Sequence, residues 1–175
     1  ARACQLDAIV SIDGDDIFTA PEALRAVYEL LVTGASVAKT TGLPLGMNAW
    51  GYSVLALQNA LYDLDVNMLE TGWGRIFDKI SSENQEFRCD CADRVRATLD
   101  YDEDLRFFDS CVNSIHHWQK LPVYEFVDQI VKMELHEINA SVNSKYWDNF
   151  NMNIATEQVQ NIERSYSQRL NHVIP

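Results

Sequence analysis

The sequence predicts an all-α fold: a single-domain bundle of about six helices around a central apolar helix, linked by disulfides. Three observations lead to this prediction. A long charge-free segment has helical spacing, amphipathic helical patterns occur on both sides of it, and no stretch alternates apolar and polar residues as a strand does. A chain of 175 residues can bury a sizeable core, so residues 1–175 are expected to form one helical domain.

The N-terminal quarter of the chain is expected to contain a short helix and a longer one. Scattered apolar residues before position 13 allow about two helical turns within residues 1–18. Thr19 is a suitable N-cap, Pro21 suits the first helical turn, and Glu22 completes a capping box. The second helix is therefore expected to extend to about Lys39.

The central helix is predicted over residues 47–69, after a loop at 40–46 that holds a proline between two glycines. Its apolar residues recur every three or four positions, and no charge occurs between Thr40 and Tyr62. A helix that is apolar nearly all round needs neighbours on several sides. The residues on its main face are Trp50, Val54, Leu57, Leu61, Leu64 and Met68.

The second half of the chain shows further helical patterns. Ser82 and Gln85 form a capping-box pattern at the start of a predicted helix that ends near Leu99. The acidic run 100–104 is expected to form a turn and the negatively charged first turn of the next helix. The inner face of that helix is predicted to hold Leu105, Phe108, Val112 and Ile115. Two more helices are predicted, from Pro122 to about Leu135 and from Ala155 to about Val173.

The four cysteines are expected to form two disulfides. Cys91 and Cys111 lie ten residues on either side of Tyr101, so an antiparallel helical hairpin would place them at the same height. This symmetry favours a Cys91–Cys111 bond, with Cys4 bonded to Cys89. The pairing of Cys4 with Cys91 and of Cys89 with Cys111 stays open. A zinc site at Cys89 and Cys91 is not expected, because Cys-x-Cys alone supplies only two ligands.

Composition limits the partners of the protein. The chain has 26 acidic and 14 basic residues and a formal charge of −12, which repels nucleic acid and anionic membrane surfaces. No membrane span is expected, because the uncharged segment 40–62 contains proline, glycine and amide residues. An alanine at position 1, the cysteines and the glycosylation sequon at Asn139 together favour a secreted, extracellular protein.

Catalytic and metal-binding motifs are not recognised in the sequence. No histidine has an acidic residue three positions before it, as paired-metal helical bundles require. The spacing of Asp100, Asp102 and Asp104 resembles a calcium loop, but Leu105 and Cys111 occupy its diagnostic positions. The acidic segment 13–16 is interpreted as a solvated turn. The prediction is therefore a protein without metal or cofactor that is not an enzyme.

The aromatic content suggests a function. The apolar central helix carries small residues and rings on its second face, and such a helix can line a cavity between helices. We therefore expect a secreted helical protein that binds a hydrophobic, lipid-like small molecule within the bundle. The alternative is a secreted protein–protein interaction module that acts through its acidic surface and has no ligand cavity. The expected ligand-binding residues are Trp50, Val54, Leu57, Leu61, Tyr62, Trp73, Phe108 and Trp118.

Overall fold

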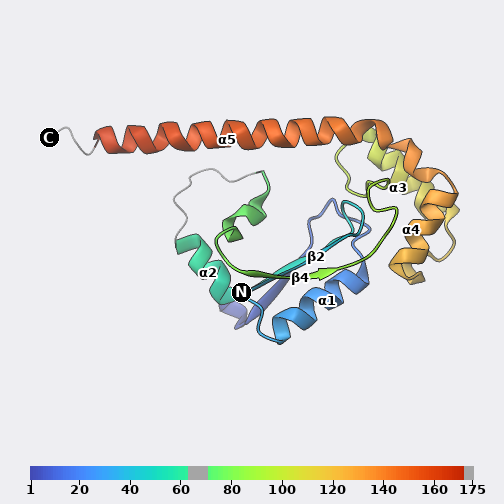
Figure 1. Ribbon diagram of the computed structural model, residues 1–175, viewed down its shortest axis with the longest axis horizontal. Coiled ribbons are helices and arrows are strands. Elements are labelled where there is room, and N and C mark those ends of the chain that lie inside the picture. The colour runs from blue at the N-terminus through green and yellow to red at the C-terminus, as the bar shows by residue number, and fades with distance from the viewer. Residues whose placement is uncertain (63–70, 172–175) are drawn as a thin grey trace.

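A computed structural model describes residues 1–62 and 71–171 and shows an α/β fold, not a helical bundle (Figure 1). Its described strands are β1 (Ala8–Ser11), β2 (Val37–Thr41), β3 (Trp50–Ser53) and β4 (Ser82–Glu86). The described α-helices are α1 (Pro21–Val32), α2 (Val54–Tyr62), α3 (Asp102–Ser114), α4 (Val123–Lys132) and α5 (Asn143–Asn171). Short 3-10 helices are η1 (Arg2–Cys4), η2 (Trp73–Phe77), η3 (Trp118–Lys120), η4 (Leu135–Ile138) and η5 (Ala140–Val142).

The strands form one mixed sheet in the order β1-β3-β2-β4. β3 is antiparallel to both of its neighbours, and Tyr52 pairs with Ile9 on one side and with Val37 on the other. β4 is parallel to β2, from the pair Val37 and Ser82 to the pair Thr41 and Glu86. It follows that β1, β2 and β4 all point in the same direction, and their carboxyl ends lie at the same edge of the sheet.

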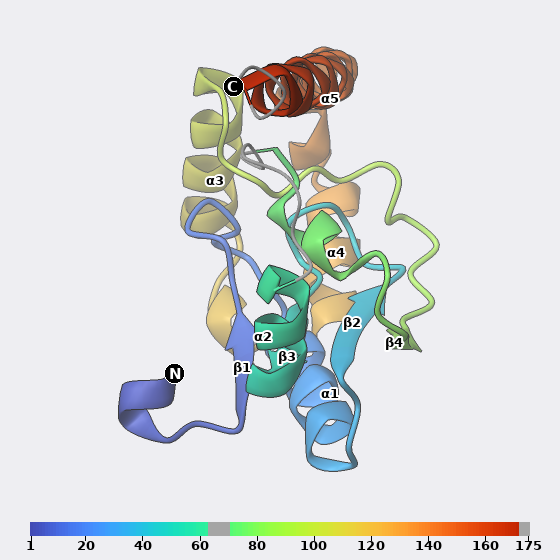
Figure 2. The ribbon, with the colours of Figure 1, turned by 90° about the vertical axis from the view of Figure 1, so that its left-hand side faces the viewer.

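Helices cover both faces of this sheet (Figure 2). On one face, α1 packs closely over Gly51, where an added Cβ would lie 2.5 Å from Val27 Cγ1 and 2.7 Å from Leu31 Cδ1. On the other face, α2 and η2 form a smaller cluster in which Val37 packs with Phe77. Ala38, the next residue of β2, belongs to the larger core on the α1 side. This alternation of neighbouring side chains is what a strand between two helical layers requires.

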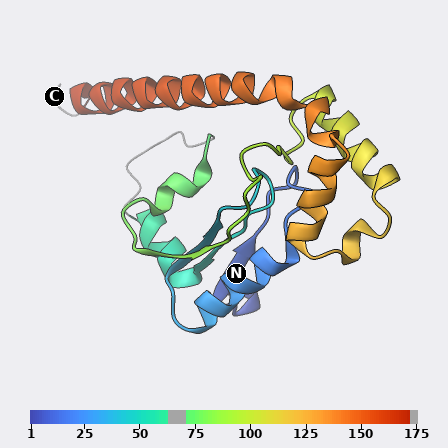
Figure 3. The ribbon, with the colours of Figure 1, turned by 45° about the vertical axis from the view of Figure 1, so that its right-hand side comes forward.

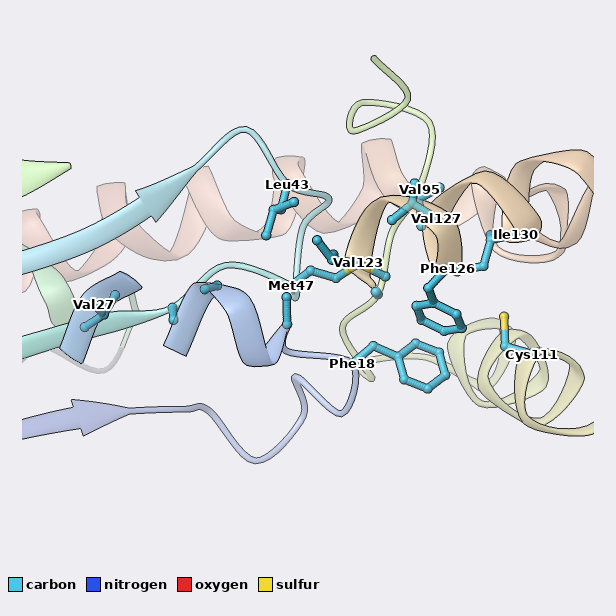
Figure 4. Packing of buried hydrophobic residues seen from close by; sticks show 14 of the residues in the cluster. Phe18, Val27, Leu43, Met47, Val95, Cys111, Val123, Phe126, Val127 and Ile130 are labelled. Carbon is cyan, nitrogen blue, oxygen red and sulfur yellow. The ribbon is translucent and has the colours of Figure 1, made fainter. Parts of the chain in front are cut away.

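The larger core extends beyond the sheet to α3 and α4, which lie together at one end of the molecule (Figure 3). Phe18 is at its centre, with ring centroids 4.6 Å from Phe108, 4.9 Å from Trp118 and 5.0 Å from Phe126. Figure 4 shows Phe18 and Phe126 pointing toward each other, with Cys111 of α3 close by. This core holds the two helices against the segment that follows β1.

The long helix α5 crosses the molecule from the α3 and α4 end toward α2 (Figure 1). Glu157 attaches it to η2: its carboxylate accepts hydrogen bonds from the Arg75 guanidinium at 2.6 Å and from the Thr71 backbone N–H at 2.7 Å. Burial raises the pKa of Glu157, but the hydrogen bonds from Thr71 and Arg75 outweigh it and lower the pKa overall. Among the described helices, none combines the length and the apolar character that crossing a membrane requires.

The predicted central helix over residues 47–69 is wrong. Its first part is a strand, because the backbone of Trp50–Ser53 pairs with β1 and β2, and the helix begins only at Val54. That helix lies at the surface, with 54% of Leu61 and 90% of Tyr62 exposed. Leu64 and Met68 lie outside the described residues. The spacing of apolar residues does not distinguish one long helix from the observed structure here, because a short apolar strand followed by a short helix shows a similar pattern.

Other predicted elements are also corrected. Residues 8–11 are a strand, α1 ends at Val32 instead of Lys39, and residues 82–86 form β4 instead of opening a helix. Thr19 is not the N-cap of α1, because that cap is Ala20. The expected helices that follow the acidic run 100–104 and that extend over 122–135 are confirmed by α3 and α4, and the last helix starts at Asn143 instead of Ala155.

The predicted disulfides are absent from the structure. Cys4, Cys89, Cys91 and Cys111 are all free. Without the helix predicted over 82–99, the hairpin that would have paired Cys91 with Cys111 does not exist. Cys111 is completely buried, and burial raises the pKa of its thiol to about 12. This thiol acts as a small apolar core group.

Candidate functional site

A cleft of about 430 Å³ opens beside the carboxyl ends of β1 and β2. Acidic residues that follow β1 and polar residues from the end of β2 line it. In open sheets with parallel strands, ligands bind in the crevice at the carboxyl ends of those strands. The cleft is therefore the main candidate for a functional site. Its charged and polar lining includes Asp13, Asp15, Asp16, Lys39, Asn48 and Thr98.

The most distinctive feature of this cleft is a cluster of carboxylates from two distant segments. Asp15 follows β1, whereas Asp100 lies directly before α3. The Thr98 hydroxyl lies between them, 3.2 Å from Asp15 Oδ2 and 3.4 Å from Asp100 Oδ2. A hydroxyl has a single proton and donates to one carboxylate at a time. Thr98 therefore keeps the two carboxylates close to each other without neutralising either.

The loop after β2 holds the second of these segments in place. Leu45 bridges to Arg96, and the Ala97 backbone N–H donates to the Leu45 carbonyl at 2.8 Å. Gly46 follows in the left-handed region with a φ of 86°, and an added Cβ would lie 2.1 Å from the Ala97 carbonyl oxygen. Only glycine allows this approach. The close packing of the loop fixes the strand-like segment that leads to Thr98 and Asp100.

The electrostatics of the cleft show an excess of negative charge. The pKa of Asp16 is raised to about 6 by burial and then by Asp15, while a hydrogen bond from Thr98 lowers it and Asp13 and Asp100 raise it further. Burial and the nearby Asp100 also raise the pKa of Tyr146, which extends into the cleft from the first turn of α5. Among the described residues, no ion pair joins Asp13, Asp15 or Asp16 to a basic side chain.

The excess of negative charge predicts that ionised Asp16 lowers the stability of the folded protein. Its pKa is higher in the folded than in the unfolded protein, so folding favours the protonated form, and stability falls as the pH rises from about 4 through 6. Without divalent cations, Asp16→Asn is expected to raise the free energy of unfolding by about 1 kcal/mol at pH 8, because solvent screening at this partly buried site reduces the effect. At pH 4 the variant and the unaltered protein should be equally stable.

Urea unfolding at both pH values, in the presence of EDTA, measures this difference. The exposed Asp109→Asn in α3 is the matched control and should leave stability within about 0.5 kcal/mol at either pH. Equal stability of Asp16→Asn and the unaltered protein at pH 8 would contradict the crowding of carboxylates in the cleft.

The described part of the chain holds no group of three histidine, cysteine or acidic side chains arranged to bind a metal ion. A site formed by two carboxylates is different, because Mg²⁺ is commonly bound by one or two carboxylates together with substrate phosphates. Asp15 at the wall of the cleft and Asp100, which lies next to the cleft residue Thr98, supply oxygen ligands of this kind. The interpretation of segment 13–16 as an isolated solvated turn did not include Asp100, which the fold brings near it.

The residues predicted to bind a ligand do not gather around one cavity. Trp50, Leu57 and Trp73 pack with the small cluster on the α2 side of the sheet, whereas Phe108 and Trp118 pack with the large core. Val54 is half-buried, and Leu61 and Tyr62 face solvent. Trp118 lines a crevice of about 150 Å³, which is small for a lipid-like molecule. Of the predicted set, Trp50 lines the acidic cleft, and Trp73 Nε1 donates to Asp13 at its edge.

The predicted glycosylation residue Asn139 is completely buried. Its Nδ2, the atom to which a sugar is attached, donates to the Arg96 carbonyl at 3.0 Å and to Asp104 Oδ1 at 2.8 Å. A sugar on this nitrogen is incompatible with the folded structure. The sequence pattern alone could not show this, because a sequon carries no information on burial.

Comparisons with known proteins identify a structural neighbour. No protein-family model matches the sequence, and no curated protein matches it either. Among solved structures, the fold is similar to that of a cytidylyltransferase from Leptospira borgpetersenii serovar Hardjo-bovis, with a TM-score of 0.64 and 16% sequence identity. The match covers 78% of this chain and 60% of that chain. At this identity the match shows a shared fold.

The α/β fold and this neighbour overturn the functional predictions that depended on a helical bundle. The lipid-binding carrier has no bundle to enclose its ligand, and the finding against the acidic-surface interaction module is the fold shared with a cytidylyltransferase. The expectation that the protein is not an enzyme is corrected too, because the fold is one that a cytidylyltransferase uses. The extracellular location, the single domain and the exclusion of nucleic acid stay predictions.

Proposed function

We propose that the protein is an enzyme of nucleotidyl transfer, in which the acidic cleft binds the acceptor substrate beside a divalent cation. The observation that carries this proposal is the meeting of Asp15 and Asp100 at the carboxyl ends of parallel strands. The fold shared with a cytidylyltransferase favours nucleotidyl transfer over other reactions that acidic clefts perform.

Asp15 and Asp100 are the residues that would hold the cation. Both are carboxylates, the ligand type that Mg²⁺ prefers, and their pairing leaves coordination positions for phosphate oxygens. When bound, a divalent cation neutralises the charge of a triphosphate and of the transition state for phosphoryl transfer. Burial is the main cause of the raised pKa of Asp16, and the repulsion from Asp15 that adds to it fits the same role, because a cation relieves it.

The remaining cleft residues suit a polar acceptor. Lys39 lies over the Trp50 ring, with Nζ 5.6 Å from the ring centroid, and both line the cleft. Its ammonium can bind an anionic group of the acceptor, and the Tyr146 hydroxyl can bind a hydroxyl group. These contacts orient the acceptor oxygen, which forms a bond to the α-phosphorus of a nucleoside triphosphate as the bond to pyrophosphate breaks. Orientation of this kind supplies much of the catalysis in phosphoryl transfer.

Release of pyrophosphate tests this function. With Mg²⁺, each of the four nucleoside triphosphates and a panel of phosphorylated or carboxylated sugars, we expect acceptor-dependent release, greatest with the cytidine nucleotide. Asp15→Asn and Asp100→Asn should each lower the rate by about 100-fold or more, because a lost metal ligand removes transition-state stabilisation.

The exposed Asp102→Asn, two residues from Asp100, is the matched control and should retain the rate. Acceptor-dependent release that survives in both Asp15→Asn and Asp100→Asn would contradict the role of these carboxylates. No release with any nucleotide and any acceptor of the panel would contradict nucleotidyl transfer.

A further inference from the structure

A buried ionic network lies directly behind Asp100. The Arg96 side chain is 3% exposed and that of Asp104 is completely buried. Arg96 Nε donates to Asp104 Oδ1 at 3.0 Å, and its Nη2 donates to Asp104 Oδ2 at 3.2 Å. The same Nη2 donates to Asp100 Oδ2 at 2.5 Å. One guanidinium therefore joins a core carboxylate to Asp100, whose carboxylate lies beside the cleft residue Thr98.

Asp104 is itself held firmly. Its Oδ2 accepts the backbone N–H groups of Asp100 and Tyr101, each at 3.0 Å, at the start of α3. Its Oδ1 accepts Asn139 Nδ2 at 2.8 Å, and the same amide donates to the Arg96 carbonyl at 3.0 Å. The Arg96 guanidinium, which bonds both carboxylate oxygens of Asp104, is thus held by a fixed partner in the core. Both the backbone and the side chain of Asp100 are tied to this network.

The network also reaches the wall of the cleft through Tyr146. The Tyr146 ring lies over the Arg96 guanidinium, with a distance of 4.3 Å from Cζ to the ring centroid. Tyr146 lines the cleft, so it covers the guanidinium on the cleft side. A planar arginine can stack on a ring and form its fork of hydrogen bonds at the same time, which lysine cannot do.

The charge balance of this network suits a cation site. Arg96 carries one positive charge and is flanked by the negative charges of Asp104 and Asp100, so the three groups together keep one negative charge. A lone arginine beside Asp100 would oppose a cation, whereas an arginine neutralised by Asp104 does not. Buried ion pairs contribute little net stability, so stability alone is a weak explanation for this arrangement.

We propose that Arg96 is a positioning residue that fixes the carboxylate of Asp100 for binding the divalent cation, with Asp104 and Asn139 holding Arg96 in turn. This inference rests on the proposed function. The Asp100 side chain is 32% exposed, so without Arg96 it would sample several rotamers. Hydrogen bonds that orient a metal ligand raise metal affinity, and their loss typically costs tenfold or more.

Mn²⁺ binding, followed by electron paramagnetic resonance of the free ion, tests the inference. Arg96→Lys keeps the positive charge but loses the planar fork that bonds both Asp104 oxygens while it reaches Asp100, and we expect it to weaken Mn²⁺ affinity about tenfold. Val127→Ala is the control: Val127 is 1% exposed in α4, so its truncation lowers stability. It should leave Mn²⁺ affinity unchanged, which separates positioning from a general loss of stability.

A double-mutant cycle shows whether Arg96 acts through Asp100. In the Asp100→Asn background, Arg96→Lys should weaken Mn²⁺ binding no further, because its target carboxylate is already gone. If Arg96→Lys does not fold, Asn139→Ala replaces it in the cycle, with an expected loss of about threefold.

The outcomes separate this inference from the proposed function. If the unaltered protein binds Mn²⁺ and Arg96→Lys binds it equally well, positioning by Arg96 is overturned while the cation site stands. An equal further loss in the Asp100→Asn background also overturns it, since Arg96 would then act elsewhere. If the unaltered protein binds no Mn²⁺, the proposed function fails and the inference fails with it.

Discussion

Gly46→Ala is expected to lower the free energy of unfolding by about 3–5 kcal/mol. Two unfavourable contributions to the free energy of the folded protein add at this position. A φ of 86° disfavours any residue with a Cβ, and the new Cβ would lie 2.1 Å from the Ala97 carbonyl oxygen and 2.4 Å from its carbon. Both obstructing atoms belong to the backbone and cannot rotate away. The loop must therefore move from the segment that carries Thr98 and Asp100. Urea unfolding measures the loss.

Two other glycines separate these contributions. Gly34 has a φ of 108° but open space around an added Cβ, so Gly34→Ala should cost about 1 kcal/mol from the backbone conformation alone. Gly14 has open space and no such φ, and Gly14→Ala should stay within about 0.5 kcal/mol. If Gly46→Ala cost no more than Gly34→Ala, the close contact between the loop and Ala97 would be refuted.

Phe107→Ala is expected to cost about 4 kcal/mol, the second-largest effect. Phe107 is completely buried in the large core, and its ring centroid lies 5.5 Å from that of Phe108 and 6.3 Å from that of Phe18. Removing the ring leaves a cavity between α3 and the segment that holds Phe18, and the packed backbone cannot close it fully. Thermal or urea unfolding of the purified variant measures the loss.

Leu105→Ala is the matched control on the same helix. Leu105 is 51% exposed, so its truncation should cost well under 1 kcal/mol. The sequence pattern predicts the reverse order, because it places Leu105 on the inner face of the helix and does not include Phe107. A larger loss for Leu105→Ala than for Phe107→Ala would therefore favour the bundle over the α/β fold.

The helices of the second half were predictable because their signals are local. The acidic first turn of α3 and the proline before α4 mark their starts, and apolar spacing continues through both. The predicted inner face of α3 is right for Phe108 and Ile115 and wrong for Leu105 and Val112, which face solvent, whereas Phe107 and Cys111 are buried. Four apolar positions in a helix can fit two overlapping faces, and only the surrounding elements decide between them.

The sequence does not predict the sheet, because its strands are short and form through pairing with other segments of the chain. β1 and β3 have four residues each, too few to establish an alternation. β4 has the sequence Ser-Glu-Asn-Gln-Glu with every residue exposed, so it forms because β2 offers a free backbone edge. That edge is a property of the folded chain, and composition does not encode it.

The sequence indicates one of the two segments that form the acidic site. A β-branched run that ends in the acidic segment 13–16 is a signal for polar residues at the carboxyl end of a strand. Asp100 is 85 positions beyond Asp15, and no local pattern links them. The network around Arg96 likewise combines a loop, α3 and the residues before η5. Only the tertiary structure brings these groups together.

Binding of Mn²⁺ to the unaltered protein and to its carboxylate variants shows whether Asp15 and Asp100 form a cation site. We expect one Mn²⁺ site from which Mg²⁺ displaces the ion, with affinity lost or weakened at least tenfold in both Asp15→Asn and Asp100→Asn and kept in Asp102→Asn. Mn²⁺ binding that is the same in all four proteins, or absent from the unaltered one, would contradict this expectation.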